Sequence, residues 1–359
     1  MTVLVSTPTK ADNSMAATTA MSSAGTTGRT TLTRPSHAAE AADGARIPRE
    51  FVHRADDSDI LLTHFQACAD GSYRMAARWP RAHALFSPVA GSRENPMLMA
   101  ETIRQAGAVV SHMAYDAPTD LHFLLWDLRY EVPEDVLGAG VPLSPANAVV
   151  RFDDVKMRGK RLSSFRFEVE LYRGAVRVGH GAASASCVSQ AAYSRLRPAR
   201  PEFADPAPLP APISPVLVGR TRAQDVLVAP SGTPGSWLLR ADRSHPVIFD
   251  SQSDHMPGRG VIEAMRQAAQ LATGYEHIIV PSMNAEFCRY VELDRPCHIT
   301  AERRRPLPDG RIPTRVTLTQ DDEVAARGML MVRPADADSA ADSGTNGTSA
   351  PAAFAVAAL

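Results

Sequence analysis

The sequence has 359 residues, enough for two domains that each bury a hydrophobic core. Hydrophobic residues make up 44% of the chain and charged residues 21%, and the formal net charge is -1, so no overall positive field favours a nucleic-acid partner. No apolar run reaches the roughly 18 residues that cross a bilayer, so we expect no membrane partner and a cytoplasmic protein.

Three segments of biased composition divide the chain. Residues 1–45 are rich in Ser, Thr and Ala and lack the apolar core of a secretory signal, so we expect a disordered extension. Residues 198–215 contain seven prolines, which favours an extended linker. Residues 335–359 have the composition of a second disordered tail. Two domains remain between these segments, at 46–197 and 216–334.

The two domains repeat one another in sequence. Val-His-Arg at 52–54 returns as Val-Gly-Arg at 218–220. Glu-Thr-Ile-Arg-Gln-Ala at 101–106 returns as Glu-Ala-Met-Arg-Gln-Ala at 263–268. An ordered series of matches of this kind indicates a duplicated structural unit.

Each domain is predicted to contain one long helix followed by strands. Residues 96–113 and 257–272 are apolar on nearly every face, which is typical of a buried helix. The sequence then alternates with the two-residue period of strands, for example at 166–172 and 314–319. We therefore expect an α+β protein with a double (tandem) hotdog fold, in which each half is an antiparallel sheet around one central helix. The two sheets are expected to join edge to edge, which would hide exposed strand edges.

A polar triplet interrupts both apolar helices, with Glu, Arg and Gln at positions i, i+3 and i+4 on one stripe. Its members are Glu101, Arg104 and Gln105 in the first domain and Glu263, Arg266 and Gln267 in the second. Burying an unpaired carboxylate costs several kcal/mol, so each Glu must be paired or functional. An ion pair on a solvated face, or a structural role that pins the halves together, is the alternative to a catalytic role.

Two resemblances follow from these residues. Met256-Pro257-Gly258, followed by the second triplet, is similar to the central-helix signature of hotdog acyl-thioester dehydratases, in which a Pro-Gly turn opens the helix and a Glu is the catalytic acid/base. Over roughly residues 50–333 the chain resembles the AfsA family, the enzymes that make γ-butyrolactone autoregulators. The segments that carry this resemblance are residues 98–106, Phe-Leu-Leu-Trp-Asp-Leu at 123–128 and Asp-His-Met-Pro-Gly at 254–258.

The AfsA resemblance implies an acyltransferase. A β-ketoacyl group would pass from acyl carrier protein to the hydroxyl of dihydroxyacetone phosphate. The product, a 2-oxo-3-phosphooxypropyl 3-oxoalkanoate ester, would close to a butenolide phosphate on the way to γ-butyrolactone, butenolide or furan signals that control antibiotic production. No cofactor or metal is implied, and the oligomeric state and the acyl chain length are left open.

Roles for individual residues follow from this chemistry. We expect Glu263 to be the base, with a pKa raised by its apolar helix. The backbone N–H of Gly258 at the helix start is a candidate oxyanion donor. Arg266 or Arg104 would hold the phosphate, and Glu101 would have a pairing role from the other half. Further candidates for substrate binding are Gln267, Gln105 and His255. Because the Pro-Gly turn occurs only in the second half, we expect at most one competent site per chain.

Other interpretations stay open. A hotdog dehydratase or thioesterase would need only the acyl thioester, and a non-catalytic protein would only bind an acyl ligand. His83 and His245 precede the helices roughly where hotdog dehydratases carry a catalytic His, although a structural role is the simpler one. The four cysteines show no CxxC pairing and predict free thiols.

Overall fold

The computed structural model describes residues 44–80, 83, 85–86, 95–133, 136, 145–197 and 208–335. Most of the expected N-terminal extension, part of the proline-rich linker and nearly all of the expected tail therefore lie outside the described residues. The two predicted domains both lie largely within them.

The first half contains one long helix and seven strands among its described residues. In chain order its elements are β1 (Ala45–Arg46), the 3-10 helices η2 (Arg49–Val52) and η3 (Asp57–Asp59), β2 (Leu62–Ala67), β3 (Tyr73–Ala77), α1 (Leu98–Tyr115), β4 (His122–Glu131), β5 (Asn147–Arg158), β6 (Arg161–Arg173) and β7 (Val176–Val188). A short helix, α3 (Gln190–Leu196), follows, and the Ser189 side chain caps it by accepting the Ala192 N–H.

The second half repeats this order. Its elements are η4 (Pro215–Val218), η5 (Ala223–Asp225), β8 (Val228–Pro230), β9 (Ser236–Leu239), α4 (Gly258–Thr273), β10 (Ile278–Phe287), β11 (His298–Arg303), β12 (Ile312–Gln320) and β13 (Glu323–Pro334). Both helices and the strands predicted around 166–172 and 314–319 are confirmed.

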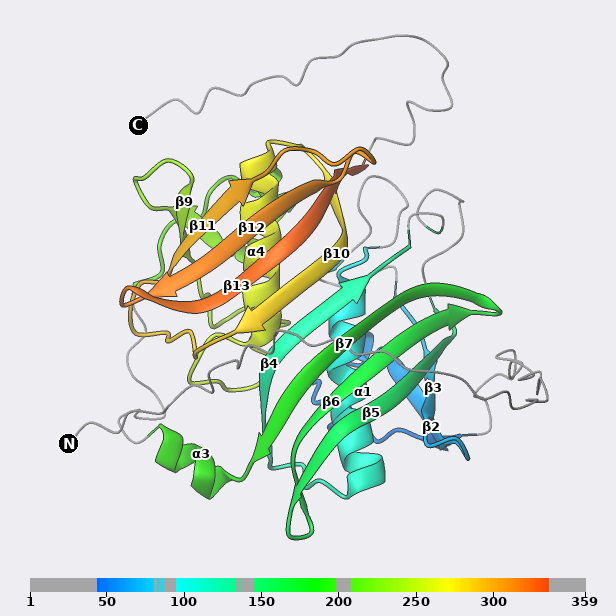
Figure 1. Cartoon of the computed structure of the whole chain (residues 1–359). Coiled ribbons are helices and arrows are strands. Elements are labelled where there is room, and N and C mark those ends of the chain that lie inside the picture. Colours follow the sequence, from blue (N-terminus) through cyan, green and yellow to red (C-terminus); the bar gives the residue numbers. More distant parts are fainter. Residues whose placement is uncertain are drawn as a thin grey trace, which may run out of the picture. The chain divides into compact units, whose positions relative to one another are not determined.

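One antiparallel sheet runs through both halves. Its 13 described strands follow the order β1-β2-β3-β5-β6-β7-β4-β10-β13-β12-β11-β9-β8 (Figure 1). The halves join where β4 pairs with β10, from Glu131 opposite Ser282 to Asp127 opposite Glu286. The predicted edge-to-edge union of the sheets is therefore confirmed, and backbone hydrogen bonds satisfy the two edges that meet there.

Each half of the sheet curves around its own helix. α1 packs on β4, β6 and β7, and α4 packs on β11, β12 and β13, so both helices lie on the same side of the sheet (Figure 1). α1 packs closely on the sheet at Gly107. A Cβ added to Gly107 would lie 2.7 Å from the Phe167 ring on β6. This arrangement is the predicted double hotdog fold.

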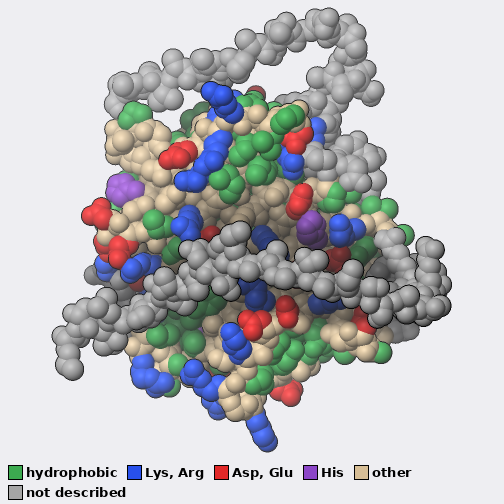
Figure 2. All heavy atoms as spheres, viewed as in Figure 1, with side chains coloured by type: hydrophobic (Ala, Val, Ile, Leu, Met, Phe, Trp, Pro, Cys, Tyr) green, Lys and Arg blue, Asp and Glu red, His purple; other side chains and the backbone are tan. Residues whose placement is uncertain are grey.

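The surface carries charges of both signs. On the face in Figure 2, basic and acidic side chains are interspersed over both halves, in keeping with the net charge of -1. None of the described helices combines the length and the apolar character that a membrane span requires.

Candidate active site

The second-half triplet is a closed, fully buried cluster. Glu263 has no exposed surface, and its carboxylate lies 2.7 Å from Arg220 Nη2 and 2.8 Å from Arg266 Nη2. Gln267 is the third residue that donates to it, through Nε2 at 2.7 Å. Burial alone would raise the pKa of Glu263, but the two guanidinium groups outweigh burial and hold the pKa below its ordinary value. The expectation of a raised pKa is wrong.

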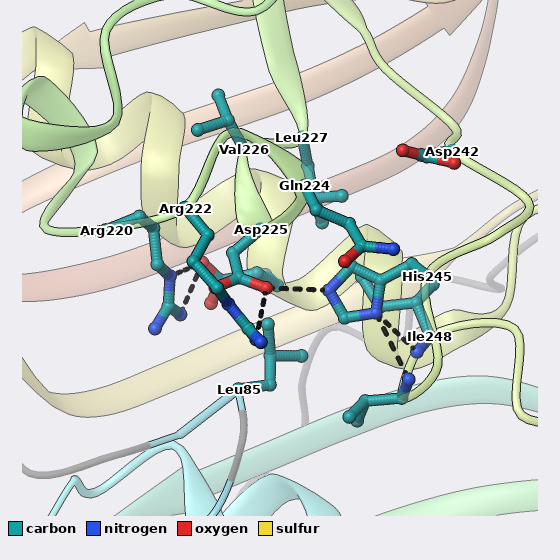
Figure 3. A network of polar contacts seen from close by, with 12 residues as sticks. Leu85, Arg220, Arg222, Gln224, Asp225, Val226, Leu227, Asp242, His245 and Ile248 are labelled. Carbon is teal, nitrogen blue, oxygen red and sulfur yellow. Dashed lines mark hydrogen bonds and ion pairs between the residues drawn. The ribbon is translucent and has the colours of Figure 1, made fainter.

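A second chain of contacts locks the loop in front of this cluster. Asp225 accepts from Arg222 at 2.9 Å and lies 3.2 Å from Nε2 of His245, while Nδ1 of His245 accepts the Ile248 N–H at 3.1 Å (Figure 3). His83 repeats this pattern in the first half with Asp59 and the Phe86 N–H. Both histidines are buried, and their ring nitrogens contact the loops around them. These contacts indicate a structural role.

The first-half triplet has the same internal bonds but a different exposure. Arg54 Nε donates to Glu101 at 2.7 Å, and Gln105 Nε2 donates to Glu101 at 3.0 Å. Arg104 Nη1 donates to Glu101 at 3.0 Å, and its side chain is 26% exposed, against 7% for Arg266. Arg54, Arg259 and Arg104 outweigh the opposing effect of burial and hold the pKa of Glu101 well below its usual range.

One residue explains the difference in exposure. In the second half Gln270 Oε1 accepts from Arg266 Nη1 at 2.7 Å, and Gln270 Nε2 donates to the Glu276 carbonyl at 2.7 Å. The matching position on α1 is Ala108, whose side chain ends at Cβ. Because Ala108 has no side-chain amide, some N–H groups of Arg104 have no acceptor among the described residues.

The space in front of Arg104 is part of a cavity of about 740 Å³ that residues of both halves line. Aromatic and aliphatic side chains make up one wall, among them Phe123, Leu125, Phe165 and Phe167. Arginines line another part, namely Arg54, Arg104 and Arg259. The cavity therefore joins an apolar surface to a group of charged side chains, in which Asp250 lies between Arg54 and Arg259.

The start of α4 opens into this cavity. Pro257 precedes the first helical residue, Gly258, and both line the cavity. A Cβ added to Gly258 would meet nothing closer than the Phe287 ring at 3.8 Å, so a ligand can approach the backbone there. The first N–H groups of a helix have no partner within the helix, and the helix dipole favours negative charge at this end.

Arg259 connects the helix start to the first half. Its Nη1 lies 3.4 Å from Asp59, and its Nη2 lies 3.1 Å from Asp250. Asp250 also lies 3.6 Å from Arg54. The carboxylates thus hold two of the cavity arginines in place across the boundary between the halves.

His255 lies on the cavity wall beside the helix start. Its Nδ1 is 2.7 Å from Asp254, which also accepts from Tyr193 and Arg197, each at 2.7 Å. These bonds outweigh burial and hold the pKa of Asp254 well below its usual range. The carboxylate therefore accepts the Nδ1 proton and fixes the orientation of the His255 ring.

The predicted site residues fall into two groups. Four of them line the cavity, namely Arg104, Gln105, His255 and Gly258. The other four are buried behind it, namely Glu101, Glu263, Arg266 and Gln267. Gln105 and Gln267 each tie their helix to the preceding loop, at the carbonyls of Asp59 and Asp225.

Sequence reasoning missed several residues that line the cavity. Arg259 and Asp250 do not belong to a recognisable sequence motif. His53 and Arg54 were noted only as part of the repeat, although the change from His53 to Gly219 between the halves was a signal of divergence. The four cysteines have free thiols, and burial raises the pKa of Cys187 and of Cys297 to about 12.

The fold and the cavity between its halves define a double hotdog protein. The model of the A-factor biosynthesis hotdog domain, AfsA, matches residues 36–189 and 202–336. The chain belongs to this family. It is 39% identical over 289 residues to a 2-oxo-3-(phosphooxy)propyl 3-oxoalkanoate synthase of Streptomyces virginiae, with 80% of this chain and 98% of that protein aligned.

A synthase of the same name from Streptomyces coelicolor is 34% identical over 278 residues, which cover 77% of this chain and 88% of that protein. Among solved structures, a putative oleoyl thioesterase from Lactobacillus plantarum is 13% identical, with a TM-score of 0.42. The alignment covers 73% of this chain and 95% of the thioesterase.

Proposed function

We propose that this chain is an acyltransferase that condenses a β-ketoacyl thioester with dihydroxyacetone phosphate to a 2-oxo-3-(phosphooxy)propyl 3-oxoalkanoate. Membership of the AfsA family and the names of its relatives support this reaction. The acyl donor is acyl carrier protein, and the ester closes afterwards to a butenolide phosphate.

One observation carries the proposal. The same cavity contains an apolar wall, an open helix N-terminus and an arginine with unused donors. An acyl chain fits the wall formed by Phe123, Phe165 and Phe167. A thioester carbonyl can accept a hydrogen bond from the N–H groups at the helix start. A phosphate can accept hydrogen bonds from the arginine.

Gly258 supplies the oxyanion donor in this scheme. The carbonyl oxygen becomes negative when the substrate hydroxyl attacks, and a backbone N–H at a helix start stabilises that charge without having to reorganise. The absence of a Cβ lets the thioester come within hydrogen-bond distance of the backbone.

Arg104 holds the phosphate. Its guanidinium can donate two parallel bonds to phosphate oxygens, and Glu101 keeps the side chain in position through Nη1. Arg54 and Arg259 line the same cavity, but carboxylates already pair with both of them. Arg266 is unsuited to this role because Glu263, Gln270 and the Val218 carbonyl already accept its protons.

The remaining predicted residues have supporting roles in this proposal. Glu263, Arg266 and Gln267 form a structural tie in the second half, and Gln105 does the same in the first. His255 contacts the substrate near the helix start, where Asp254 fixes its orientation.

A product assay tests the reaction. The protein is incubated with a β-ketoacyl-carrier-protein thioester, with and without dihydroxyacetone phosphate, and the products are identified by mass. We expect the phosphorylated ester only when both substrates are present. Consumption of the thioester alone would indicate a dehydratase or thioesterase, and no change in either substrate would indicate an acyl-binding protein.

A further inference from the structure

Two histidines of the first half form a bonded pair at the cavity. Nε2 of His53, the residue after η2, lies 2.8 Å from Nε2 of His112 on α1. Nδ1 of His112 lies 2.6 Å from the backbone carbonyl of Ala117. Phe51 stacks on His112 with ring centroids 4.9 Å apart, which fixes the plane of that imidazole.

These contacts determine where the protons lie. A carbonyl oxygen only accepts, so Nδ1 of His112 must carry a proton. Burial lowers the pKa of His112, so the ring is neutral at pH 7 and its Nε2 is an acceptor. Nε2 of His53 must then be the donor in the pair. The lone pair of a neutral His53 is left on Nδ1.

This nitrogen belongs to a residue of the cavity wall. His53 lines the cavity, and no described residue bonds its Nδ1. Nδ1 is not one of the completely buried unpaired polar atoms among the described residues, so it keeps some exposed surface. A small hydroxyl compound in the cavity can reach it.

The backbone at His53 is strained in a way that the second half avoids. His53 has φ +50°, in the left-handed region, where a residue with a Cβ costs about 1–2 kcal/mol relative to the right-handed one. The matching residue after η4 is Gly219, and the residue that matches His112 is Gly274, the C-cap residue that follows α4. The duplicated half thus lacks both histidines, and strain of this kind is typical of a functional position.

His53 also lies close to the groups that we propose bind the substrates. Its ring packs edge-on against Phe123 at 5.7 Å between centroids, and Leu125, two residues along β4, is the neighbour of Gly258. Alternate residues of a strand share a face and are about 7 Å apart. Arg104 is near enough to influence the His53 titration.

We propose that Nδ1 of His53 is the general base of the acyl transfer, with His112 as the positioning residue that fixes its tautomer. This inference rests on the proposed function. Nδ1 takes the proton of the dihydroxyacetone phosphate hydroxyl while that oxygen forms a bond to the thioester carbonyl carbon. The C–S bond then breaks, and the departing thiolate takes the proton back from the His53 imidazolium, so the protein is unchanged at the end.

The base strengthens when the phosphate binds. Burial first, and then His112, Arg54 and Arg104, lower the pKa of His53 to about 4 in the empty protein. His112 and Arg104 on α1 and Arg54 after η2 are the titratable and charged groups that face the His53 ring. Phe123, its neighbour on β4, is uncharged. A phosphate dianion on Arg104 offsets the positive charges and favours imidazolium, so the pKa of His53 rises towards neutrality. The base is therefore activated when the correct acceptor is present.

Nitrogen NMR of the ¹⁵N-histidine-labelled protein tests the arrangement without turnover. We expect His53 to show protonated Nε2 and unprotonated Nδ1 at pH 7, with a titration near pH 4. Inorganic phosphate or dihydroxyacetone phosphate should move the titration upward. A proton on Nδ1 in the free protein, or a His53 titration that phosphate leaves unchanged, overturns the inference.

Kinetics of matched variants test the role in catalysis. His53→Asn keeps a side chain that tolerates the left-handed backbone but removes the basic nitrogen, so kcat should fall by about 10²- to 10⁴-fold with KM for dihydroxyacetone phosphate nearly unchanged. A His53→Asn variant with the wild-type kcat shows that the base lies elsewhere. If wild-type protein forms no ester, the proposed function fails instead, and the two failures are thereby distinguished.

The positioning role has its own pair of variants. His112→Gln can place an amide oxygen near the position of Nε2 and still accept the hydrogen bond from His53. The shorter side chain of His112→Asn can reach the Ala117 carbonyl but not His53. We expect the Gln variant to keep most of kcat and the Asn variant to lose about tenfold or more. Equal kcat values for the two variants contradict the positioning role.

Discussion

In the first half of the molecule Arg104 lies beside Ala108 and faces a cavity, whereas in the second half Arg266 is covered by Gln270. The Glu–Arg–Gln triplets themselves make nearly the same bonds. Their surroundings differ, because one amide side chain fills the space that the other half leaves open. A motif that occurs twice can therefore have a structural role in one copy and a binding role in the other.

The difference extends to the helix ends. The Pro-Gly start of α4 belongs to the second half, while Arg104, Arg54 and His53 belong to the first. In the proposed reaction a complete site needs both contributions, a helix end from one copy and charged groups from the other. The expectation of at most one competent site per chain stays a prediction.

The largest effect is expected from Glu263→Gln. Removing this charge leaves Arg220 and Arg266 buried without a counterion, which typically costs about 3–5 kcal/mol of stability. Thermal unfolding should shift down by on the order of 10 °C. Glu101→Gln is the matched control and should lose less, because Arg104 can turn towards the cavity and Asp250 remains as a counterion 3.6 Å from Arg54. A Glu263→Gln variant with native stability and no turnover would restore Glu263 as the catalytic base.

The two arginines should separate binding from stability. Arg104→Gln removes a charged bond to the phosphate and should raise KM for dihydroxyacetone phosphate by about 10- to 100-fold. Arg266→Gln should lower the unfolding midpoint and leave KM unchanged. Steady-state kinetics and thermal denaturation of both proteins check this, and the reverse pattern would assign the phosphate to the second half.

Exchanging the residues that cover the arginines should sharpen the comparison. Ala108→Gln supplies the amide that covers Arg266 and should lower kcat/KM for dihydroxyacetone phosphate by about tenfold without a large change in stability. Gln270→Ala leaves Arg266 Nη1 and the Glu276 carbonyl without their partner and should cost about 1–3 kcal/mol. Full activity in the Ala108→Gln protein would show that the space beside Arg104 is not needed.

The smallest effect is expected from Gly219→Ala. Gly219 has φ +62°, and an added Cβ would lie 3.2 Å from Gln270 Oε1, so strain and a tight contact act together. We expect a loss of about 1–2 kcal/mol in denaturant unfolding and no change in turnover. Gly71→Ala is the control, since Gly71 has φ +77° with nothing within 4 Å of the added Cβ. Equal losses for the two variants would show that the Gln270 contact contributes nothing.

Much of the fold followed from local patterns. The apolar stretches at 96–113 and 257–272 predicted both buried helices, because a helix that is apolar on every face has to be enclosed. The repeat predicted two similar halves, and the cost of exposed strand edges predicted their union through β4 and β10. The pairing of Glu101 and Glu263 with arginines followed from the same reasoning about buried charge.

The candidate site followed only in part. The sequence placed Arg104, Gly258 and His255 among the candidates because they belong to motifs. It favoured Glu263 as a base with a raised pKa, and the structure reverses the sign of that shift, because Arg220 arrives from 43 positions away in the chain. No spacing rule reveals a partner that is brought in by a loop.

The amino-acid sequence alone determined the duplicated architecture, the two central helices and the polar triplets within them, since periodicity and buried charge are properties of neighbouring residues. The tertiary structure decided which triplet reaches a cavity, which histidines line that cavity and how residues of both halves come together around it. Those outcomes depend on which side chains fill the space between distant segments, and packing of that kind is set only when the chain has folded.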